Sequence, residues 1–454
     1  MNNNKPTILV IFGISGDLAR RYLLPAIGAI ANASMLPEQF HIVGLTRQKD
    51  IKIDSLLKKT SNIEYLQKNM DLQQMDVTNI DDYKKLGKFL ENLGKSFDTP
   101  PQYIFYLSVP PQVSRSIIEL LGISGLSKMP ARNAEVIASA GGGETKLLLE
   151  KPFGINLENA TELAKHIDKY FLPTQVYRVD HYMAKETAQN IIVFREGNSL
   201  FKKTWNKDFI ERIEIIASEE IGIEGRANFY EQVGALRDYV QSHLLQLLAL
   251  ILMDLPDNNR FDDVPHLRLE ALKHLNIINI KENALRGQYE GYIEEVNNPK
   301  SKVETFVSIT LESKDERWIG VPMILTTGKA LQNKSTLIRI LYKKDKEYES
   351  NELLLRLQPE EGIQFNMWAK NPGYERKVSP HHLSFKFREH YDILPEAYEQ
   401  VLFNAINSDH SLFTTSDEIL EAWRVLDLLQ KTWEKSGDGL IIYKKGSTLE
   451  EILR

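Results

Sequence analysis

The chain has 454 residues, 42% of them hydrophobic, and a net charge of −6 at pH 7 with acidic and basic residues interspersed. Because neither sign of charge is gathered into a field, binding to nucleic acid or to a membrane surface is not expected. The absence of cysteine excludes disulfides, thiolate metal sites and cysteine nucleophiles. The start of the chain lacks a signal-peptide core, and the longest apolar segment, residues 244–253, is too short to span a bilayer, so a cytoplasmic protein is expected.

A strand, a glycine turn and a helix open the chain. Residues 7–12 are continuously apolar, which predicts a parallel β-strand buried on both faces. The turn after it contains Gly13 and Gly16, which allow backbone N–H groups to approach a pyrophosphate closely. Because the turn lacks a full G-x-G-x-x-G pattern, a plain strand–turn–helix explains it about as well. Pro25 is expected to break or restart the helix.

The second strand bears on the choice of cofactor. Residues 40–45 complete a βαβ unit, and the strand ends in Thr46-Arg47 without an acidic residue. A dinucleotide with a free ribose 2′-hydroxyl usually meets an acid at this point, whereas an arginine suits a 2′-phosphate. The sequence therefore favours NADP over NAD. The alternative, a solvated Arg47 in a loop, carries roughly a third of the weight.

Two further buried strands lead toward the same edge of the sheet. Residues 103–109 stop at Pro110, which places Ser108 beside the cofactor crevice. Residues 146–149 end in Glu150-Lys151-Pro152-Phe153-Gly154, which delivers Lys151 to the nicotinamide. The Lys151–Pro152 bond is a candidate cis peptide, since such bonds occur almost only before proline. Residues 122–145 are expected to form a loop, one short amphipathic piece and a flexible turn, without chemistry.

Polar chemistry is concentrated in the nonapeptide Arg178-Val179-Asp180-His181-Tyr182-Met183-Ala184-Lys185-Glu186. An apolar run over residues 172–179 predicts a strand, and the periodicity after it predicts a helix over residues 182–196. His181, Tyr182 and Lys185 could then converge on one anion, with free N–H groups at the helix start adding to the attraction. The alternative is a helix cap followed by a solvated charged face, which is favoured for so short a stretch taken alone.

After the nonapeptide the pattern changes to strand after strand. Apolar and polar residues alternate over residues 212–217 and 303–311, and further strands are expected over residues 324–327, 337–342, 353–358 and 384–387. The chain is therefore predicted to have an α/β Rossmann-type dinucleotide-binding domain over residues 1–180. An α+β domain for substrate binding and oligomerisation, with a large, mainly antiparallel sheet, is predicted over residues 181–454.

One helix of the second domain contains a candidate catalyst. The helix over residues 237–252 is apolar nearly all round, so it is predicted to be buried, and His243 lies one residue inside its apolar run. A histidine in such a place is more often a satisfied core residue than a catalyst, by roughly two to one. A carboxylate bonded to its other nitrogen would instead orient it as a general base, and Asp180 is the candidate.

Taken in order, these motifs resemble those of the glucose-6-phosphate dehydrogenase family over nearly the whole chain. The glycine turn, Arg47, the Glu-Lys-Pro-Phe-Gly motif and the nonapeptide each match a family motif. Later matches lie at residues 224–226, 237–238, 242–246, 328–330, 358–359, 409–413 and 416–424. The nonapeptide together with His243 is the most specific part of the resemblance.

The resemblance implies an enzyme of glucose metabolism and of the pentose phosphate pathway. It would oxidise glucose 6-phosphate at C1 to 6-phosphoglucono-1,5-lactone and transfer hydride to NADP. His243 would take the proton of the C1 hydroxyl, and Asp180 would orient His243. The residues implied to bind the sugar phosphate are Lys151, His181, Tyr182, Lys185, Glu219, Asp238, Lys329, Lys334 and Gln358. Those implied to bind NADP are Gly13, Ser15, Gly16, Asp17, Leu18, Arg47, Ser108, Pro110 and Lys151. No metal is implied, and a homodimer or homotetramer is expected.

The chain departs from the family in four places. Tyr22 stands where a lysine that reaches the active site is usual, and Ser242 stands where an asparagine is usual. Residues 122–145 do not resemble the family's helix, and the tail after residue 440 is short and lacks the usual tryptophan.

Two other functions stay open. One is a two-domain sugar dehydrogenase of the glucose-fructose oxidoreductase kind, which would not need phosphate-binding residues such as His181, Tyr182 and Lys185. The other is a non-catalytic NADP-binding sensor. Tyr22 favours the sensor, whereas an intact His243 with Asp180 and Lys151 argues against it.

Overall fold

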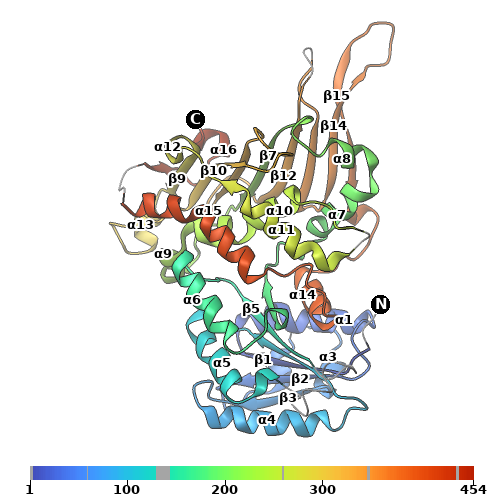
Figure 1. The fold of residues 1–454 in the computed structure, drawn as a ribbon, viewed down its shortest axis with the longest axis vertical. Coiled ribbons are helices and arrows are strands. Elements are labelled where there is room, and N and C mark those ends of the chain that lie inside the picture. Colours follow the sequence, from blue (N-terminus) through green and yellow to red (C-terminus); the bar gives the residue numbers. More distant parts are fainter. Residues whose placement is uncertain (1–3, 59, 129–143, 258–259, 345–347, 436–438) are drawn as a thin grey trace. The chain divides into compact units, whose positions relative to one another are not determined.

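The computed structural model describes residues 4–58, 60–128, 144–257, 260–344, 348–435 and 439–454. The chain forms two compact units (Figure 1). The first contains the described residues up to Gly154, together with Glu158–Ala184 and Pro395–Ser416. The second contains Ile155–Leu157, Lys185–Leu394 and the described residues from Asp417 onward. Residues 395–416 therefore belong to the first unit, whereas the sequence predicted a single domain boundary near residue 180.

A six-stranded parallel sheet forms the centre of the first unit, with the strand order β3-β2-β1-β4-β5-β6. This is the order of a dinucleotide-binding Rossmann fold, and the predicted fold class of this part is confirmed. Strands β1 and β4 are buried along their whole length, as their continuous apolar runs predicted. The strands are β1 Thr7–Phe12, β2 Phe40–Thr46, β3 Met70–Gln74, β4 Gln102–Leu107, β5 Thr145–Glu150 and β6 Val176–Val179.

The helices of the first unit mostly connect these strands. A π-helical turn, η1, precedes Pro25, and α1 continues from it, so the helix restarts at the proline as predicted. The segment predicted over residues 122–145 is described only at its ends, and residues 129–143 lie outside the described residues. The helical elements are η1 Ala19–Leu23, α1 Leu24–Asn32, α2 Ile53–Leu56, α3 Ile63–Lys68, α4 Ile80–Gly94, α5 Pro111–Ile123, η2 Leu126–Lys128, α6 Leu157–Asp168, η3 Pro173–Gln175 and α14 Ala397–Ile406.

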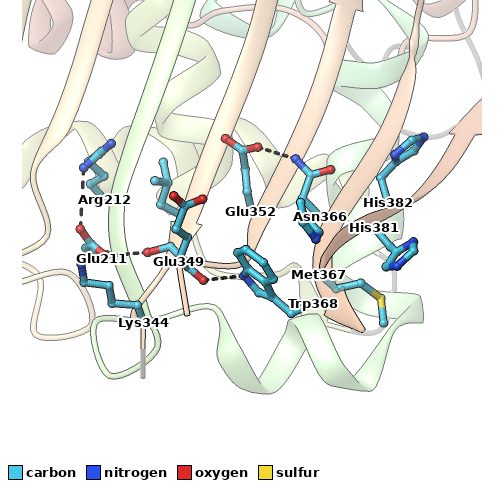
Figure 2. Close-up of a pocket in the computed structure, with 13 residues that line it drawn as sticks. Glu211, Arg212, Lys344, Glu349, Glu352, Asn366, Met367, Trp368, His381 and His382 are labelled. Atoms are coloured by element: carbon cyan, nitrogen blue, oxygen red, sulfur yellow. Dashed lines mark hydrogen bonds and ion pairs between the residues drawn. The ribbon is translucent and has the colours of Figure 1, made fainter. Parts of the chain in front are cut away.

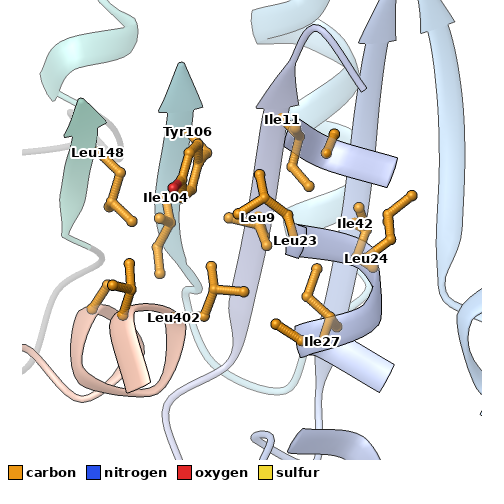
Figure 3. Packing of buried hydrophobic residues seen from close by; sticks show 14 of the residues in the cluster. Leu9, Ile11, Leu23, Leu24, Ile27, Ile42, Ile104, Tyr106, Leu148 and Leu402 are labelled. Atoms are coloured by element: carbon orange, nitrogen blue, oxygen red, sulfur yellow. The ribbon is translucent and has the colours of Figure 1, made fainter. Parts of the chain in front are cut away.

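Helix α14 explains why the chain returns to the first unit. The side chain of Leu402 in α14 packs in one apolar cluster with Leu9 and Ile104 of the sheet and with residues of α1 (Figure 3). The last carbonyls of α14 accept hydrogen bonds from Gln102 Nε2 at 2.9 Å and from Lys146 Nζ at 2.7 Å. Because cations and donors stabilise a helix C-terminus, α14 is held there by charge as well as by packing. Burial lowers the pKa of Lys146 to about 8.

A larger, mixed sheet forms the centre of the second unit, with the order β15-β14-β13-β12-β7-β11-β10-β9-β16 and with β8 paired to β10. The pairs β7–β11 and β9–β16 are parallel, and the others are antiparallel. The predicted mainly antiparallel sheet is confirmed. Its strands are β7 Ile210–Ser218, β8 Leu275–Asn276, β9 Ala284–Tyr289, β10 Phe306–Ser313, β11 Met323–Gly328, β12 Ser335–Tyr342, β13 Glu352–Gln358, β14 Gly362–Lys370, β15 Val378–Lys386 and β16 Leu440–Tyr443.

The helices of the second unit include the buried one that the sequence predicted. Every residue of α10 is buried, and Arg268 of α11 forms a fully buried ion pair of 2.7 Å with Glu418 of α15. Figure 1 shows α10, α11 and α15 along one side of the sheet and the β14–β15 ribbon projecting at its end. The helical elements are α7 Glu186–Gly197, α8 Ser199–Thr204, α9 Ala227–Ala235, η4 Leu236–Leu244, α10 Leu245–Leu252, η6 Phe261–Asp263, α11 Val264–Lys273, α12 Ile280–Asn283, α13 Tyr292–Glu295, η7 Phe387–Glu389, α15 Ser416–Lys435 and α16 Leu449–Ile452. Among the described residues, no helix combines the length and the hydropathy that a transmembrane span requires.

Candidate functional site

The turn after β1 is built for a close approach of backbone. Gly13 has a φ of +80°, and a Cβ there would lie 2.4 Å from the carbonyl oxygen of Ser108, so only glycine fits. The amides of Gly13 and Ile14 both donate to the carbonyl of Leu45, at 3.1 and 3.2 Å, which ties the turn to β2. The backbone of the turn therefore contacts the backbone at the ends of the two neighbouring strands, β2 and β4.

Three hydroxyl groups accompany this turn at the carboxyl ends of β1, β2 and β4. Ser15 Oγ and Thr46 Oγ1 lie 3.2 Å apart. Ser108 is 9% exposed, and its buried Oγ has no hydrogen-bond partner among the described residues. A ligand in the crevice could supply the missing partner, which fits the predicted cofactor role of Ser108.

The other predicted cofactor residues lie around the same edge. Arg47 follows β2 and is exposed, and it makes no ion pair with any described residue. Asp17 is exposed and forms an ion pair of 3.3 Å with Arg21. Leu18 caps η1 and Pro110 caps α5. The guanidinium of Arg47 is thus the part of this set that is open to a phosphate.

The predicted Lys151 corner follows the half-buried carboxylate of Glu150. The Lys151–Pro152 bond is cis, as predicted. Tyr106 donates to Glu150 Oε1 at 2.5 Å, and the phenol of Tyr398 also bonds to this carboxylate. Tyr22, the residue that replaces the family's lysine, lies with its ring centroid 5.4 Å from that of Tyr398. A network of tyrosines therefore surrounds the carboxylate beside Lys151.

The nonapeptide folds differently from the prediction. The carboxylate of Asp180 accepts the amide of Tyr182 at 2.9 Å, and the Asp180 carbonyl accepts the amide of Met183 at 3.1 Å. This Asx-type turn delays the helix, which begins only at Glu186 with Lys185 as its N-cap. The prediction of a helix from residue 182 is wrong for that reason, since the aspartate side chain competes with the helix for its own backbone.

The start of α7 also differs from the prediction of free amides. The amide of Thr187 donates to Glu361 Oε2 at 3.1 Å, and its hydroxyl donates to the Arg356 carbonyl at 2.7 Å. A carboxylate therefore already occupies one of the first N–H groups of this helix. His181 and Tyr182, whose rings lie 4.8 Å apart, belong to the first unit, whereas Lys185 belongs to the second. Their convergence on one anion stays a prediction, as does the pairing of Asp180 with His243.

In the second unit, His243 and Asp238 lie on the π-helical segment η4, a type of helix that is frequent at functional sites. His243 is 1% exposed and Asp238 is 8% exposed. The segment begins at a carboxylate, because Glu304 Oε1 accepts the amide of Leu236 at 3.0 Å. Ser242, at the position where the family has asparagine, donates to the Asp238 carbonyl at 2.6 Å. Its hydroxyl is thus satisfied within the helix.

Tyr239 lies among the predicted site residues, although the sequence analysis did not include it in the site. Its ring lies 5.6 Å from the ring of His243, edge to face, and 5.8 Å from the ammonium of Lys329. Lys329 is 2% exposed and forms an ion pair with Glu219. The predicted residues His243 and Lys329 therefore both lie near the ring of Tyr239, and Glu219 is joined to them through its ion pair with Lys329. The only sequence signal was the position of Tyr239 four residues before His243 on a helix.

Lys334 and Gln358, two more predicted residues, lie at the same end of the large sheet as Glu219. Glu219 follows β7, Lys334 precedes β12 and Gln358 ends β13. Gln358 donates to Thr336 Oγ1 at 2.9 Å, and the amide of Lys334 donates to Glu220 at 3.1 Å. Since β7, β12 and β13 are neighbours, these side chains lie along one edge.

A distinct cavity of about 580 Å³ lies at the opposite end of these three strands (Figure 2). Its polar groups pair with one another. Asn366 donates to Glu352 at 2.6 Å, and the Trp368 indole donates to the Glu349 carbonyl at 3.0 Å. None of the predicted site residues lines it, so this cavity is separate from the edge with Glu219 and Lys329.

Comparison with known proteins relates both units to one family. Residues 10–190 match the family described as glucose-6-phosphate dehydrogenase, NAD binding domain, and residues 192–451 match glucose-6-phosphate dehydrogenase, C-terminal domain. The chain is 34% identical over 483 residues to a glucose-6-phosphate 1-dehydrogenase of Chlamydia pneumoniae, covering 98% of this chain and 93% of that protein. It is 33% identical over 468 residues to glucose-6-phosphate 1-dehydrogenase 5, cytoplasmic, of Arabidopsis thaliana, covering 97% and 88%.

A solved structure is similar over the same length. A glucose-6-phosphate dehydrogenase in complex with its substrate glucose-6-phosphate superposes with a TM-score of 0.89 at 28% identity. The superposition covers 99% of this chain and 97% of that one. The likeness therefore includes both units and is not confined to the widespread dinucleotide-binding fold.

Proposed function

Because the chain belongs to the glucose-6-phosphate dehydrogenase family, a family of oxidoreductases, we propose that it oxidises glucose 6-phosphate at C1 to 6-phosphoglucono-1,5-lactone with hydride transfer to NADP. The observation that carries the proposal is the match of both domains to that one family, since the second domain would hold the substrate. The positions of His243 and Lys329 beside Tyr239, and the ion pair of Lys329 with Glu219, support it.

Features of the first unit support the binding of a dinucleotide, and Arg47 supports NADP over NAD. The glycine turn at Gly13 and the hydroxyls of Ser15 and Ser108 would face the pyrophosphate and its ribose. The open guanidinium of Arg47 would bind the 2′-phosphate, which NAD lacks. When bound, the nicotinamide accepts the hydride. Lys151, at its corner after β5, would lie beside it.

The chemistry of this chain's own residues then follows from their types. His243 would accept the proton of the C1 hydroxyl as the hydride leaves C1, and Asp180 would stabilise the charged imidazole. Asp238, Glu219, Lys329 and Gln358 would bind sugar hydroxyls. Cationic and phenolic groups would bind the sugar phosphate, namely His181, Tyr182, Lys185 and Lys334.

The test is NADPH formation, followed by absorbance, with glucose 6-phosphate as substrate. We expect turnover with the sugar phosphate and far less with free glucose. Faster turnover of an unphosphorylated sugar would favour the wider class of sugar dehydrogenases instead. Calorimetric binding of NADP without turnover of either sugar would favour a non-catalytic sensor.

We further propose that the protein self-associates as a homodimer or homotetramer and works in the cytoplasm. Leu383 and Phe385 alternate on the edge strand β15 and are 65% and 38% exposed, which favours burial against another surface. Light scattering after size exclusion tests the assembly. The Arabidopsis relative that is named cytoplasmic supports the location, and cell fractionation tests it.

A further inference from the structure

The last strand of the chain contacts the backbone of a predicted substrate residue. Strand β16 pairs in parallel with β9 at the edge of the large sheet, with Tyr443 opposite Tyr289. Tyr443 is 4% exposed and belongs to an apolar cluster with Tyr230, Tyr292 and Phe306. Its phenol donates to the carbonyl of Lys329 at 2.7 Å. The cluster therefore places one polar atom of the C-terminal strand directly on Lys329.

This bond is the end of a directed chain of hydrogen bonds. The amide of Tyr289 donates to Thr305 Oγ1 at 3.0 Å, and Thr305 Oγ1 lies 2.8 Å from the Tyr443 phenol. The phenol also lies 3.3 Å from the Thr305 carbonyl, but the Lys329 carbonyl is nearer, at 2.7 Å. With its single hydrogen directed to Lys329, the phenol accepts from the Thr305 hydroxyl. The donors thus run from the backbone of β9 through two hydroxyls to Lys329. Each bond polarises the next, so the chain favours one orientation of its groups.

The main chain around Lys329 is held from two sides. On one side, the amide of Lys329 donates to the Thr305 carbonyl and the amide of Ala330 donates to the Ile221 carbonyl, both at 2.9 Å. On the other side, the C-terminal segment contributes the amide of Gly446, which donates to the Ala330 carbonyl at 2.8 Å. Ala330 has a φ of +52°, a left-handed conformation that is strained for an alanine. The surrounding bonds hold it there.

The side chain of Lys329 is held as closely as its backbone. Its ammonium pairs with Glu219 and lies 5.3 Å from the ring centroid of Tyr230 and 5.8 Å from that of Tyr239. The side chain is 2% exposed, so close-packed neighbours enclose it. A shift of the backbone would therefore displace the ammonium relative to Glu219 and the two rings.

We propose that Tyr443 is a positioning residue for the sugar-phosphate site, and that it acts by fixing the backbone of Lys329. The inference rests on the proposed function, in which Lys329 binds a sugar hydroxyl. It makes the C-terminal strand part of the substrate site, although no residue of that strand is expected to touch substrate.

The test compares Tyr443→Phe with the matched control Tyr292→Phe. Tyr292 is a buried phenol of the same cluster that bonds to Glu231 at 2.8 Å, so its loss costs a similar hydrogen bond. We expect Tyr443→Phe to raise KM for glucose 6-phosphate by about 3- to 10-fold, the equivalent of one hydrogen bond, with kcat and KM for NADP within about twofold. Tyr292→Phe should leave all three constants near wild type. Equal kinetics in the two variants would overturn the proposal.

A double-mutant cycle with Lys329→Ala tests the route through Lys329. If Tyr443 acts only through that lysine, Lys329→Ala/Tyr443→Phe should bind glucose 6-phosphate no more weakly than Lys329→Ala alone. Additive losses would overturn the proposal. A failure of the proposed function would be distinguishable, because the wild-type protein itself would then show no turnover of glucose 6-phosphate. A wild-type enzyme that is active, with Tyr443→Phe unchanged, refutes only the role of Tyr443.

Discussion

The phenol of Tyr106 donates a hydrogen bond of 2.5 Å to the carboxylate of Glu150, one residue before Lys151. Burial raises the pKa of Glu150 to about 7, and this effect exceeds the opposing effects of the Tyr106 bond and of the Lys151 charge. Glu150 therefore changes its protonation near neutral pH, at the corner that is expected to approach the nicotinamide.

This pKa predicts a pH-dependent stability. The unfolded chain releases the Glu150 proton near its ordinary value of 4.5, whereas the folded chain holds it until about 7. Between these values the folded state binds more protons, so a rise in pH lowers the free energy of unfolding, in total by about 3 kcal/mol. Glu150→Gln removes this contribution. Denaturant unfolding from about pH 5 to about pH 8 should therefore show the variant gaining on the wild type as pH rises.

The exposed carboxylate Glu158, replaced by glutamine, is the control for this measurement. Its difference from the wild type should stay constant across the same range. Parallel curves for wild type and Glu150→Gln would show that Glu150 is already ionised at low pH and that its surroundings are more polar than the structure indicates.

His243→Asn is expected to lower kcat by about 10² to 10⁴, the usual loss when a general base is removed. KM for glucose 6-phosphate should change much less, because the lost interaction belongs to the transition state. His166→Asn is a matched control, since His166 is also buried and its ring lies 3.1 Å from the Arg115 carbonyl. Steady-state kinetics of both variants test whether His243 acts as the general base. A near-normal kcat for His243→Asn would identify His243 as a core residue.

Arg47→Ala is expected to weaken NADP binding by roughly 10- to 150-fold, because a charge-assisted hydrogen bond to a phosphate contributes about 1.5–3 kcal/mol. Binding of NAD should hardly change. Calorimetric titration with both dinucleotides measures this. Lys49→Ala removes a charge from the same exposed segment and should affect neither. An equal loss for NADP and NAD would show that Arg47 contacts the shared pyrophosphate or supports the fold.

Lys185→Ala is expected to raise KM for glucose 6-phosphate by about 10- to 150-fold, the loss of one charge-assisted contact. Free glucose lacks the phosphate, so its kcat/KM should stay within a few-fold. Some loss of kcat with the sugar phosphate is expected as well, since a bound phosphate helps to position C1. Lys203→Ala, on the exposed surface of α8, is the control. An equal loss on both sugars would refute a phosphate contact at Lys185.

The sequence by itself determined the features that depend on local periodicity and on backbone sterics. Continuous apolar runs predicted β1 and β4, and an all-apolar helix predicted the buried α10. The glycine turn after the first strand was predicted from Gly13, which has a φ of +80° and whose Cβ, if present, would lie 2.4 Å from the carbonyl oxygen of Ser108. The family resemblance is confirmed over both units, because the motifs that carry it are short and local.

Only the tertiary structure decided which distant segments meet. The chain returns to the first unit because α14 packs on apolar side chains of the parallel sheet and because Lys146 and Gln102 bond to the end of α14. Tyr443 reaches Lys329 because β16 completes the edge of the large sheet beside β9. Such pairings depend on unsatisfied backbone groups and buried surfaces that exist only after other elements have packed, so no local pattern encodes them. The start of α7 was predicted wrongly for a related but more local reason. The Asp180 carboxylate accepts the amide of Tyr182, which forms a turn where the helix was expected to begin.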